Sequence, residues 1–313
     1  MHANSDTLTG GMIRSEHTQL NGVPVLKSIL VTGGASFIGG WFFRHLLQNY
    51  GDRYAAICFD NLDYCASVNN FKSVAQSSNF HFIKGDICAP KDVENALRNY
   101  HIDSIVHFAA RSHVDTSLND PLSFAQTNII GTQVLLAVAR KLGSIRRFIH
   151  ISTDEVYGEN DAQSPTAFIE EQSLHPTNPY SASKAATEMI VQAYRKSFHM
   201  SLIIVRCNNL ILRFITLLNQ RRRMPIHGDG RTSRAFLWAG DAAEALDVVF
   251  HKGTDGETYN ISSNDHLQRT NFDEALRATV DWYCRDSEGF WPNEGLGSTV
   301  VVDGDVIAED DHN

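Results

Sequence analysis

The chain has 313 residues, of which 42% are hydrophobic, and its formal net charge at neutral pH is -9. This length allows one large domain, or a large and a small one, around a packed core. The acidic balance argues against a surface for nucleic acid or for an acidic membrane. The five cysteines and fourteen histidines lack metal-site spacing, which indicates reduced thiols and no metal site.

Residues 1–24 are polar and contain glycine. They have neither a basic start nor an apolar centre, so we expect a disordered tail and not a signal peptide. No apolar run in the sequence approaches the roughly 18 residues of a membrane-spanning helix. These features predict a soluble, cytoplasmic protein.

Short apolar runs alternate with helical patterns from Lys27 to Arg206. Six runs have the length and composition of strands: SILVTG, YAAICFD, FHFIKGD, SIVHFAA, RRFIHIS and LIIVR. The helical patterns between them include FIGGWFFRHLLQ, residues 68–76, KDVENALRNY, SFAQTNIIGTQVLLAVARKL and residues 180–198. Strands that alternate with helices form a parallel sheet covered on both faces. We therefore expect an α/β fold with a doubly wound parallel sheet, a Rossmann domain, over residues 25–206.

Beyond residue 206 the alternation gives way to shorter pieces, among them PIHGDG, AFLW, ETYNIS and FDEALRATVDWY. These pieces offer too little apolar sequence for an independent core. We expect residues 207–313 to form a small, shortened substrate-binding lobe. Within it, a helix over residues 241–251 should pack back on the Rossmann domain.

A glycine-rich turn, TGGASFIGG, joins the first predicted strand to the first predicted helix. Glycines allow such a turn to be tight, and the N–H groups that open the helix can bind a pyrophosphate. Asp60 ends the second predicted strand about 20 residues later, where a carboxylate accepts ribose hydroxyls and repels a 2′-phosphate. This pattern predicts NAD as the cofactor, bound by Asp60 and by Gly33, Ser36, Phe37, Ile38 and Gly39. Ser36 stands where such turns usually have glycine, so we expect weakened or re-aimed phosphate binding.

The segment NPYSASKAA places Tyr180 and Lys184 one helical turn apart, with Asn178 as a candidate N-cap. A phenol with its ordinary pKa of about 10 is a poor base at neutral pH. A lysine ammonium and a positive nicotinamide ring beside it would lower that pKa. Tyr180 could then take a hydroxyl proton while hydride leaves for NAD.

The segment ISTDEVYG sets two carboxylates, Asp154 and Glu155, directly after a buried strand. Neighbours on a regular strand point to opposite faces of the sheet. If both carboxylates act in one pocket, the backbone must turn at Asp154. His107, inside the strand SIVHFAA, is expected to be a core histidine with satisfied hydrogen bonds.

Together these motifs resemble the extended short-chain dehydrogenase/reductase family, and within it the dTDP-glucose and UDP-glucose 4,6-dehydratases. The matching text includes VTGGASFIGG, FDNLDYCAS, GDIC, HFAARSHVDTS, TNIIGT, ISTDEVYG, NPYSASKAA, RCNN and IHGDGRTSR. In that family a tyrosine and NAD oxidise the sugar at C4. A glutamate then removes the C5 proton, an aspartic acid protonates the leaving C6 hydroxyl, and hydride returns to C6. The resemblance implies a lyase of nucleotide-sugar metabolism, such as rhamnose biosynthesis, whose product is a 4-keto-6-deoxy sugar.

The resemblance also implies a role for individual residues. Thr153 would orient the C4 hydroxyl, with Tyr180 as the oxidation base and Lys184 as its tuner. Asp154 would be the acid of the elimination and Glu155 its base. Further contacts are implied with the cofactor for Asp86, Ile87, Ala109, Ala110 and Thr127, and with the nucleotide sugar for Ser112, His113, Asn209 and Arg234. The family further implies a homodimer through the helices near residues 124–142 and 180–198.

Two gaps interrupt the resemblance, one after RCNN and one after NISSNDHLQ. Both fall in the substrate lobe, where relatives carry nucleotide contacts, and neither removes a predicted catalytic residue. Arg111 also stands where relatives usually have Glu or Gln. Two alternatives therefore stay open: an inactive or weakly active NAD-binding relative with an impaired sugar-nucleotide site, and a 4-epimerase-type reductase that works without elimination. The choice between dTDP and UDP also stays open.

Overall fold

The computed structural model describes residues 27–63, 65–158, 168–208 and 237–262, together with Arg277 and two short strands, Val300–Val302 and Asp305–Ile307. The predicted tail at residues 1–24, both gaps in the resemblance, and the predicted substrate contacts Asn209 and Arg234 lie outside this range.

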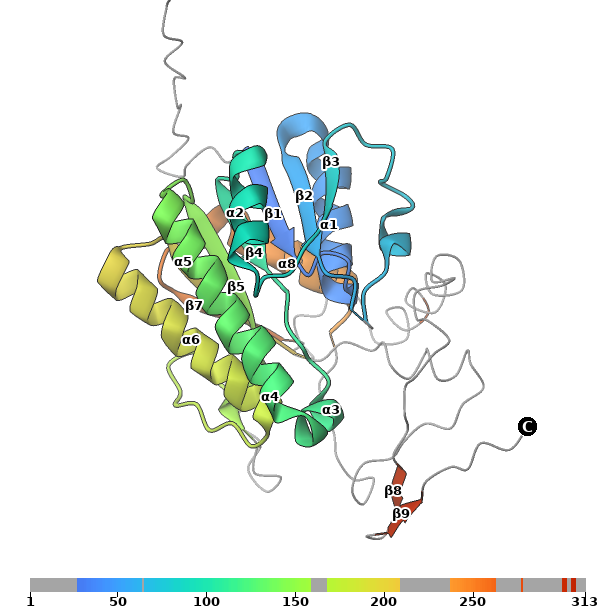
Figure 1. The fold of residues 1–313 in the computed structure, drawn as a ribbon, viewed down its shortest axis with the longest axis vertical. Helices are drawn as coiled ribbons and strands as arrows, with labels where there is room; N and C mark the ends of the chain where they lie inside the picture. The colour runs from blue at the N-terminus through green and yellow to red at the C-terminus, as the bar shows by residue number, and fades with distance from the viewer. Residues whose placement is uncertain are drawn as a thin grey trace, which may run out of the picture.

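Seven parallel strands form one sheet in the order β3-β2-β1-β4-β5-β6-β7 (Figure 1). The order reverses between β1 and β4, and open α/β sheets bind ligands in the crevice beyond the strand ends at such a point. The predicted doubly wound α/β fold is therefore confirmed. The strands are β1 (Ser28–Thr32), β2 (Ala55–Asp60), β3 (Phe80–Lys84), β4 (Ser104–His107), β5 (Arg147–Thr153), β6 (Leu202–Cys207) and β7 (Thr258–Ile261).

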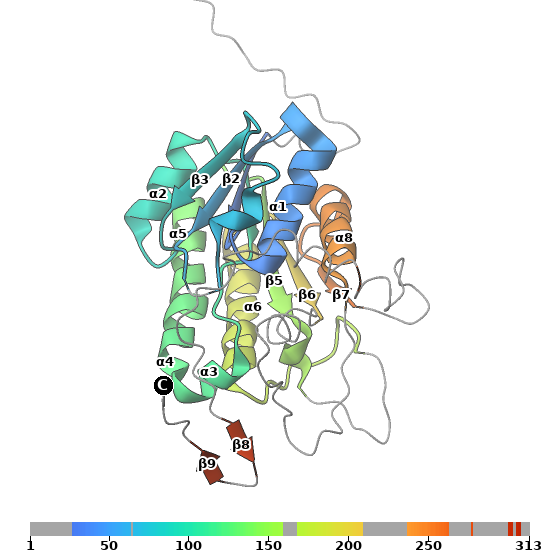
Figure 2. The same ribbon diagram turned by 90° about the vertical axis from the view of Figure 1, so that its right-hand side faces the viewer.

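Helices cover both faces of this sheet (Figure 2). On one face, α1 (Phe37–Tyr50) and α8 (Ala239–Lys252) close an apolar core that includes Phe42, Leu246 and Phe250. On the other face, α2 (Pro90–Asn99), α5 (Thr132–Leu142) and α6 (Pro179–Phe198) close a second core. Two short helices, α3 (Val114–Asn119) and α4 (Pro121–Phe124), follow β4, and a π-helical segment, Ala125–Gly131, joins α4 to α5. The strands β8 (Val300–Val302) and β9 (Asp305–Ile307) form a separate antiparallel pair.

The sheet continues beyond residue 206, where the sequence predicts the Rossmann domain to end. β7 pairs with β6 from Ile204 opposite Thr258 to Cys207 opposite Ile261. The helix predicted at residues 241–251 is α8, and it packs against α1. Part of the predicted lobe thus extends the main sheet and covers one of its faces.

The predicted helix at residues 68–76 is a single 3₁₀ turn, Val68–Phe71. Asn70 explains the difference, because its buried side chain donates to the carbonyl oxygens of Ala35 (2.8 Å) and Ser36 (3.3 Å). Asparagine side chains that bond to backbone groups compete with helix formation. The segment is therefore shaped by the glycine-rich turn that it supports.

One stretch, Pro121–Leu142, is long and apolar enough by composition to cross a membrane, with a mean hydropathy of 1.3 over its best window. No run of this length was expected from the sequence. In the structure 44% of that window is buried inside the protein. The stretch packs against α2 and α6, as a helix covering a sheet does.

Candidate active site

The carboxyl ends of the strands at the crossover surround a hollow of about 570 Å³ that opens to solvent. Small-molecule sites are concave and commonly lie at such a crossover of an α/β sheet. Two residues of the first turn of α1, Phe37 and Gly39, are buried, and Ile38 is partly buried. The wall contains most residues predicted to bind the cofactor: Gly33, Ser36, Asp60, Asp86, Ile87, Ala109, Ala110 and Thr127.

Gly33 makes the tight turn that leads from β1 into α1. Its φ is +67°, and a Cβ added here would lie 2.6 Å from the backbone nitrogen of Ala109, so only glycine fits. The N–H of Gly33 donates to the carbonyl oxygen of Phe59 at 2.8 Å. The turn is thus hydrogen-bonded to β2 and packs on the segment after β4. These two contacts place the start of α1 at the hollow.

Ser36 is the N-cap of α1. Its hydroxyl donates to the carbonyl oxygen of Gly33 at 2.6 Å and accepts from the N–H of Gly39 at 3.4 Å. Serine is a favoured N-cap because it satisfies an N–H that the helix leaves open. The same contact occupies an N–H that could otherwise bind an anion, and the weakening of phosphate binding stays a prediction.

Both carboxylate oxygens of Asp60 accept backbone hydrogen bonds, one from Ala35 at 3.0 Å and one from Leu62 at 2.8 Å. Burial raises the pKa of this carboxyl, and the two backbone bonds oppose the rise. Each oxygen of a carboxylate has about two acceptor positions. Asp60 is therefore fixed at the wall of the hollow with capacity left for ribose hydroxyls, as NAD requires.

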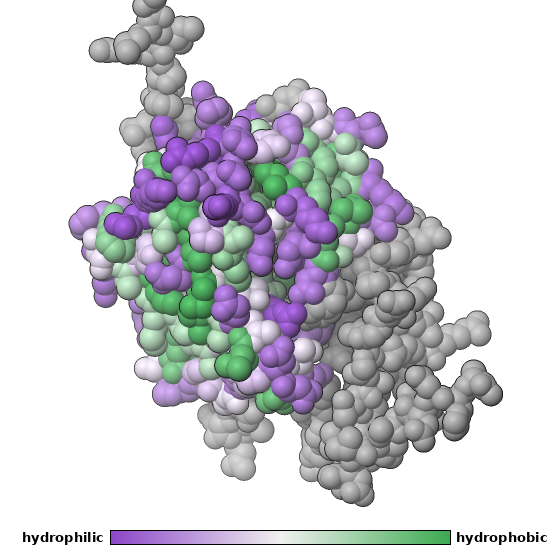
Figure 3. Space-filling view, viewed as in Figure 1, coloured by the Kyte–Doolittle hydropathy of each residue, from purple (hydrophilic) through white to green (hydrophobic). Residues whose placement is uncertain are grey.

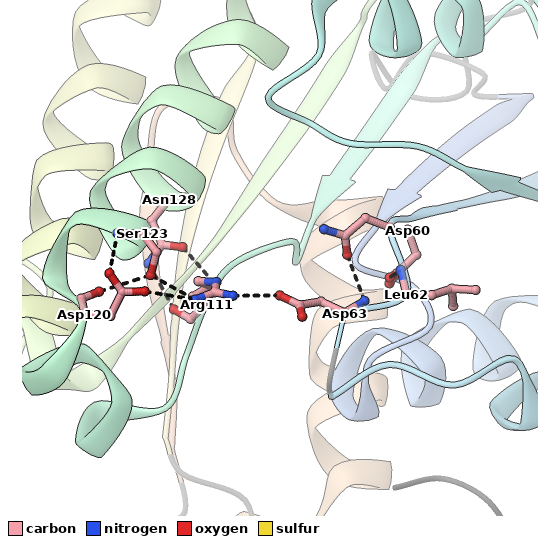
Figure 4. A network of polar contacts seen from close by, with 8 residues as sticks. Asp60, Leu62, Asp63, Arg111, Asp120, Ser123 and Asn128 are labelled. Carbon is pink, nitrogen blue, oxygen red and sulfur yellow. Dashed lines mark hydrogen bonds and ion pairs between the residues drawn. The ribbon is translucent and has the colours of Figure 1, made fainter. Parts of the chain in front are cut away.

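Arg111, in the wall of the hollow, links the loop after β2 to the start of α4 (Figure 4). Its Nη2 donates to Asp63 Oδ2 at 3.2 Å, and its Nη1 donates to Ser123 Oγ at 2.9 Å and lies 3.7 Å from Asp120 Oδ2. The side chains of Arg111 and Asp63 are 25% and 39% exposed, so this ion pair contributes at most about 1 kcal/mol. The extra charge noted at Arg111 is thus balanced by carboxylates of this chain.

Asn128 fixes the backbone of Arg111. Its Oδ1 accepts from the N–H of Arg111 at 2.8 Å, and its Nδ2 donates to the Arg111 carbonyl oxygen (3.0 Å) and to Ser183 Oγ in α6 (2.8 Å). Asn128 lies in the π-helical segment, next to Thr127 in the wall, and such segments are frequent at functional sites. Sequence reasoning missed Asn128 and Asp63, since TNIIGT reads as ordinary helix and Asp63 as loop.

β5 ends at Thr153, and a 3₁₀ turn, Asp154–Tyr157, begins at once. Thr153 caps this turn, because its Oγ1 accepts from the N–H of Glu155 and donates to Asp154 Oδ1, each at 3.3 Å. A 3₁₀ turn has about three residues per turn, so Asp154 and Glu155 no longer alternate across the sheet. The predicted turn of the backbone at Asp154 is confirmed.

α6 opens with a capping box. Asn178 Oδ1 accepts from the N–H of Ser181 at 2.8 Å, Ser181 Oγ accepts from the N–H of Asn178 at 3.2 Å, and Pro179 begins the helix. The predicted N-cap is confirmed. Asn178 Nδ2 also donates to Glu155 Oε2 at 3.3 Å, so one side chain fixes both the helix start and Glu155.

Tyr180 is buried and hydrogen-bonded to Thr153. Burial raises the pKa of Tyr180 well above its ordinary value, Glu155 and Asp154 add to the rise, and the bond to Thr153 opposes it. The predicted lowering of this pKa supposed a positive nicotinamide ring beside Tyr180, and it stays a prediction. Lys184 does not offset the burial, since its Nζ donates to the carbonyl oxygen of Ile151 at 2.6 Å.

Lys184 is itself buried, and burial lowers its pKa to about 8 although Glu188 acts in the opposite direction.

His107 is the predicted core histidine: its Nδ1 lies 2.7 Å from Thr32 Oγ1 and its Nε2 lies 2.9 Å from Thr132 Oγ1. Burial and then the charge of Lys184 lower the pKa of His107 to about 3, so this ring is neutral and structural.

Ser112 and His113 lie between β4 and α3, where Ser112 is exposed and His113 half-buried. Their contact with a sugar stays a prediction. Among the residues that the structure describes, no three histidine, cysteine or acidic side chains gather as a metal site.

Residues 30–294 match the family described as GDP-mannose 4,6 dehydratase. The chain is 38% identical to a trifunctional UDP-glucose 4,6-dehydratase/UDP-4-keto-6-deoxy-D-glucose 3,5-epimerase/UDP-4-keto-L-rhamnose-reductase of Arabidopsis thaliana, over 84% of this chain and 48% of that protein. It thus spans about half the length of that relative. It is 41% identical to the dTDP-D-glucose 4,6-dehydratase of Mus musculus, over 76% of this chain and 68% of the relative. Among solved structures, a dTDP-glucose 4,6-dehydratase from Streptomyces venezuelae with NAD and TYD bound matches with a TM-score of 0.76 and 31% identity, over 84% of this chain and 98% of that one.

The matched residues include the glycine-rich turn, the Asp154–Tyr157 turn and the start of α6. The resemblance drawn from these motifs is therefore confirmed by the family match and by relatives at 37–41% identity. The chain belongs to the nucleotide-sugar 4,6-dehydratases of the extended short-chain dehydrogenase/reductase family.

Proposed function

We propose that this chain is an NAD-dependent lyase that converts dTDP-glucose or UDP-glucose to the 4-keto-6-deoxy sugar. The observation that carries the proposal is that Asp154 and Glu155 lie in one 3₁₀ turn and that Asn178, which caps the helix holding Tyr180, donates to Glu155 at 3.3 Å. An epimerase-type reductase needs the tyrosine and the lysine but no neighbouring acid and base. Relatives named as UDP-glucose and dTDP-glucose 4,6-dehydratases support the substrate class.

The cofactor proposal is supported by the shape and chemistry of the hollow. The glycine-rich turn would hold the pyrophosphate at the start of α1, and Asp60 would accept hydrogen bonds from the adenosine ribose. Asp86 and Ile87 would contact the adenine, and Ala109, Ala110 and Thr127 the nicotinamide half; all five lie in the wall. A related structure with 31% identity contains NAD.

In the first step, Thr153 orients the C4 hydroxyl of the sugar and Tyr180 takes its proton. When bound, NAD supplies the chemistry of accepting hydride from C4 and returning it to C6. The raised pKa of Tyr180 keeps the phenol protonated in the protein alone, so its ionisation must be coupled to the arrival of positive charge at the site. Lys184 lies one helical turn away on α6 but does not by itself offset the burial of Tyr180, so the charge of the bound cofactor is needed.

In the second step, Glu155 removes the C5 proton, which the C4 ketone has made acidic. Asp154 protonates the C6 hydroxyl as it leaves. The elimination requires one of the two carboxyl groups as an acid and the other as a base. The hydrogen bond from Asn178 holds Glu155 in place for proton removal.

We also propose a homodimer formed through α5 and α6. These helices lie side by side on the outer surface, and apolar side chains gather there (Figures 1 and 3). Ile130, Met189 and Phe198 are 45%, 63% and 44% exposed. Met189→Glu should give a monomer by light scattering, and a monomeric unsubstituted chain would contradict the proposal.

A cytoplasmic location and a place in rhamnose biosynthesis are proposed on the family resemblance.

The test is incubation of the purified chain with NAD and either dTDP-glucose or UDP-glucose, followed by detection of the 4-keto product and of lost water. Tyr180→Phe should abolish turnover, and Glu155→Gln should lower kcat by about 10²- to 10⁴-fold. Glu171→Gln, at an exposed glutamate, is the matched control and should leave kcat unchanged.

Because the two gaps fall in the substrate lobe, we expect turnover of the nucleotide sugar to fall steeply and its KM to rise, since remote contacts position the reacting carbon. A normal KM would refute this expectation. Binding of NAD without any sugar product would favour an inactive relative. A product that keeps its water would favour the epimerase-type reaction.

A further inference from the structure

A buried arginine next to the catalytic turn joins several segments of the chain. Arg206, at the end of β6, donates to Glu188 of α6 from Nη2 (2.7 Å) and from Nε (3.1 Å). Their side chains are 4% and 0% exposed. Nη1 of Arg206 donates to the hydroxyl of Tyr157 at 2.6 Å and to the carbonyl oxygen of Glu170 at 3.0 Å.

Tyr157 is the last residue of the turn that begins with Asp154. Its hydroxyl accepts from Arg206 and donates to Asn260 Oδ1 in β7 at 2.8 Å. Its ring lies 4.7 Å from the Arg206 guanidinium and stacks on Phe168 at 4.7 Å with an interplanar angle of 13°. Tyr157 is thus held by three neighbours, each from a different part of the chain.

The turn is a 3₁₀ segment of only four residues, so its direction depends on what holds its ends. Thr153 caps the first end, and Tyr157 anchors the second. After it, Gly158 adopts a φ of +89°, its N–H donates to the Glu155 carbonyl oxygen (3.1 Å), and an added Cβ would collide with the carbonyl oxygen of His175. The chain therefore cannot leave the turn in another direction without rebuilding this contact.

We propose that Tyr157 is a positioning residue that orients the carboxyl groups of Asp154 and Glu155 toward the sugar. Its own position is fixed by its hydrogen bonds with Arg206 and Asn260. It touches neither substrate nor cofactor in this role. The inference rests on the proposed dehydration, because only the elimination step needs both carboxyl groups. The C4 oxidation instead depends on Thr153, Tyr180 and Lys184. None of these residues lies at the end of the turn that Tyr157 anchors.

Tyr157→Phe tests the proposal with little risk to folding. It removes one oxygen atom and keeps the ring stacked. Arg206 retains Glu188 and the carbonyl oxygen of Glu170 as partners. Asn260 retains a main-chain acceptor for its Nδ2 at 3.1 Å. Asn260→Ala is the second variant, because it removes the acceptor of the Tyr157 hydroxyl and leaves the tyrosine intact.

We expect Tyr157→Phe to lower kcat by about 10- to 100-fold, because a misplacement near 1 Å can cost about that much. KM for the nucleotide sugar should change little. Proton removal at C5 should become more rate-limiting, so the isotope effect on kcat from C5-deuterated substrate should rise. The effect from C4-deuterated substrate should fall in the same variant.

Tyr194→Phe is the matched control. It also removes a hydroxyl from a tyrosine that is 8% exposed, and that hydroxyl accepts from Gln133 Nε2 at 2.7 Å, away from the catalytic turn. This variant should keep the kcat and both isotope effects of the unsubstituted chain. If Tyr157→Phe and Asn260→Ala also keep them, the proposal is overturned.

Backbone hydrogen exchange provides a readout that does not depend on turnover. Amides of residues 153–158 should exchange faster in Tyr157→Phe and in Asn260→Ala than in Tyr194→Phe. Unchanged exchange in that segment would overturn the proposal even in an active enzyme. If the unsubstituted chain makes no 4-keto product, the proposed function fails, and exchange alone still decides whether Tyr157 holds the turn.

Discussion

Replacing Arg206 by methionine would remove the positive member of a buried ion pair. Glu188 is fully buried and would lose the three hydrogen bonds that Arg206 donates to it. The carboxylate would remain in an apolar setting between α6 and β6. Methionine fills part of the arginine volume, so the main loss is electrostatic.

Removing one partner of a buried pair costs about 3–5 kcal/mol. Arg206 also donates to Tyr157 and to a main-chain oxygen, at about 1 kcal/mol each, and the apolar contacts of methionine recover part of this. We expect the free energy of unfolding to fall by about 4 kcal/mol. At about 2–4 °C per kcal/mol for a chain of this size, Tm should fall by about 8–16 °C.

Urea unfolding followed by circular dichroism would measure this loss at about pH 8 and at about pH 5.5. A buried carboxyl group without its cation has a raised pKa. The folded variant then binds a proton that the unfolded chain releases, so its stability rises as pH falls through that pKa. The destabilisation should therefore be smaller at the lower pH.

The double variant Arg206→Met with Glu188→Met is the control, because it removes both charges. Replacing a buried pair by apolar residues is often neutral, so the double variant should recover most of the lost stability. The reasoning fails if the single variant stays within about 1 kcal/mol of the unsubstituted chain at both pH values. It also fails if the double variant is as unstable as the single one.

Three further predictions concern the site. Lys184 has a folded pKa of about 8, below its unfolded value of about 10.4. Between these pH values the unfolded chain binds more protons than the folded chain. The stability of the unsubstituted chain therefore rises as pH rises from about 8 to about 10.4. Lys184→Met should lack this gain in urea unfolding, and an identical pH dependence would contradict the burial of this charge. Asn178→Ala should cost about 1 kcal/mol and lower kcat, whereas Asn178→Ser should keep the cap but still lower kcat; equal unfolding curves for the two would contradict the capping role. Arg111→Gln should change the free energy of unfolding by less than about 1 kcal/mol, with an effect that shrinks in salt, and a loss above about 2 kcal/mol would show that the pair with Asp63 was underestimated.

The main sheet could be predicted because its inner strands are continuous apolar runs between helices. β7 escaped that reasoning: Thr258–Ile261 is short and has only one fully buried residue. Such a strand is defined by its pairing with β6, and pairing is not visible in a local pattern. The segment at residues 68–76 failed for the related reason that Asn70 bonds to a distant turn.

The candidate site also contains features that could be predicted from the sequence and features that could not. Local spacing was enough for the glycine-rich turn and for the N-cap at Asn178, whereas the turn at Asp154 was predicted from the requirement that Asp154 and Glu155 act in one pocket. The Arg111–Asp63 pair joins residues 48 positions apart, and the Tyr157–Asn260 bond joins residues 103 apart, so neither could be inferred from spacing. The rise that burial gives the pKa of Tyr180 could not be inferred from spacing, because desolvation depends on burial by the whole fold.

The central claim is that hydride leaves C4 of one hexose and returns to C6 of the same hexose while Glu155 and Asp154 remove water. Incubation with nucleoside-diphosphate glucose deuterated at C4, followed by mass spectrometry and NMR of the product, tests it most directly. The account predicts a 4-keto sugar with the deuterium in its C6 methyl group. Deuterium found back at C4, in a sugar that has kept its water, would contradict it.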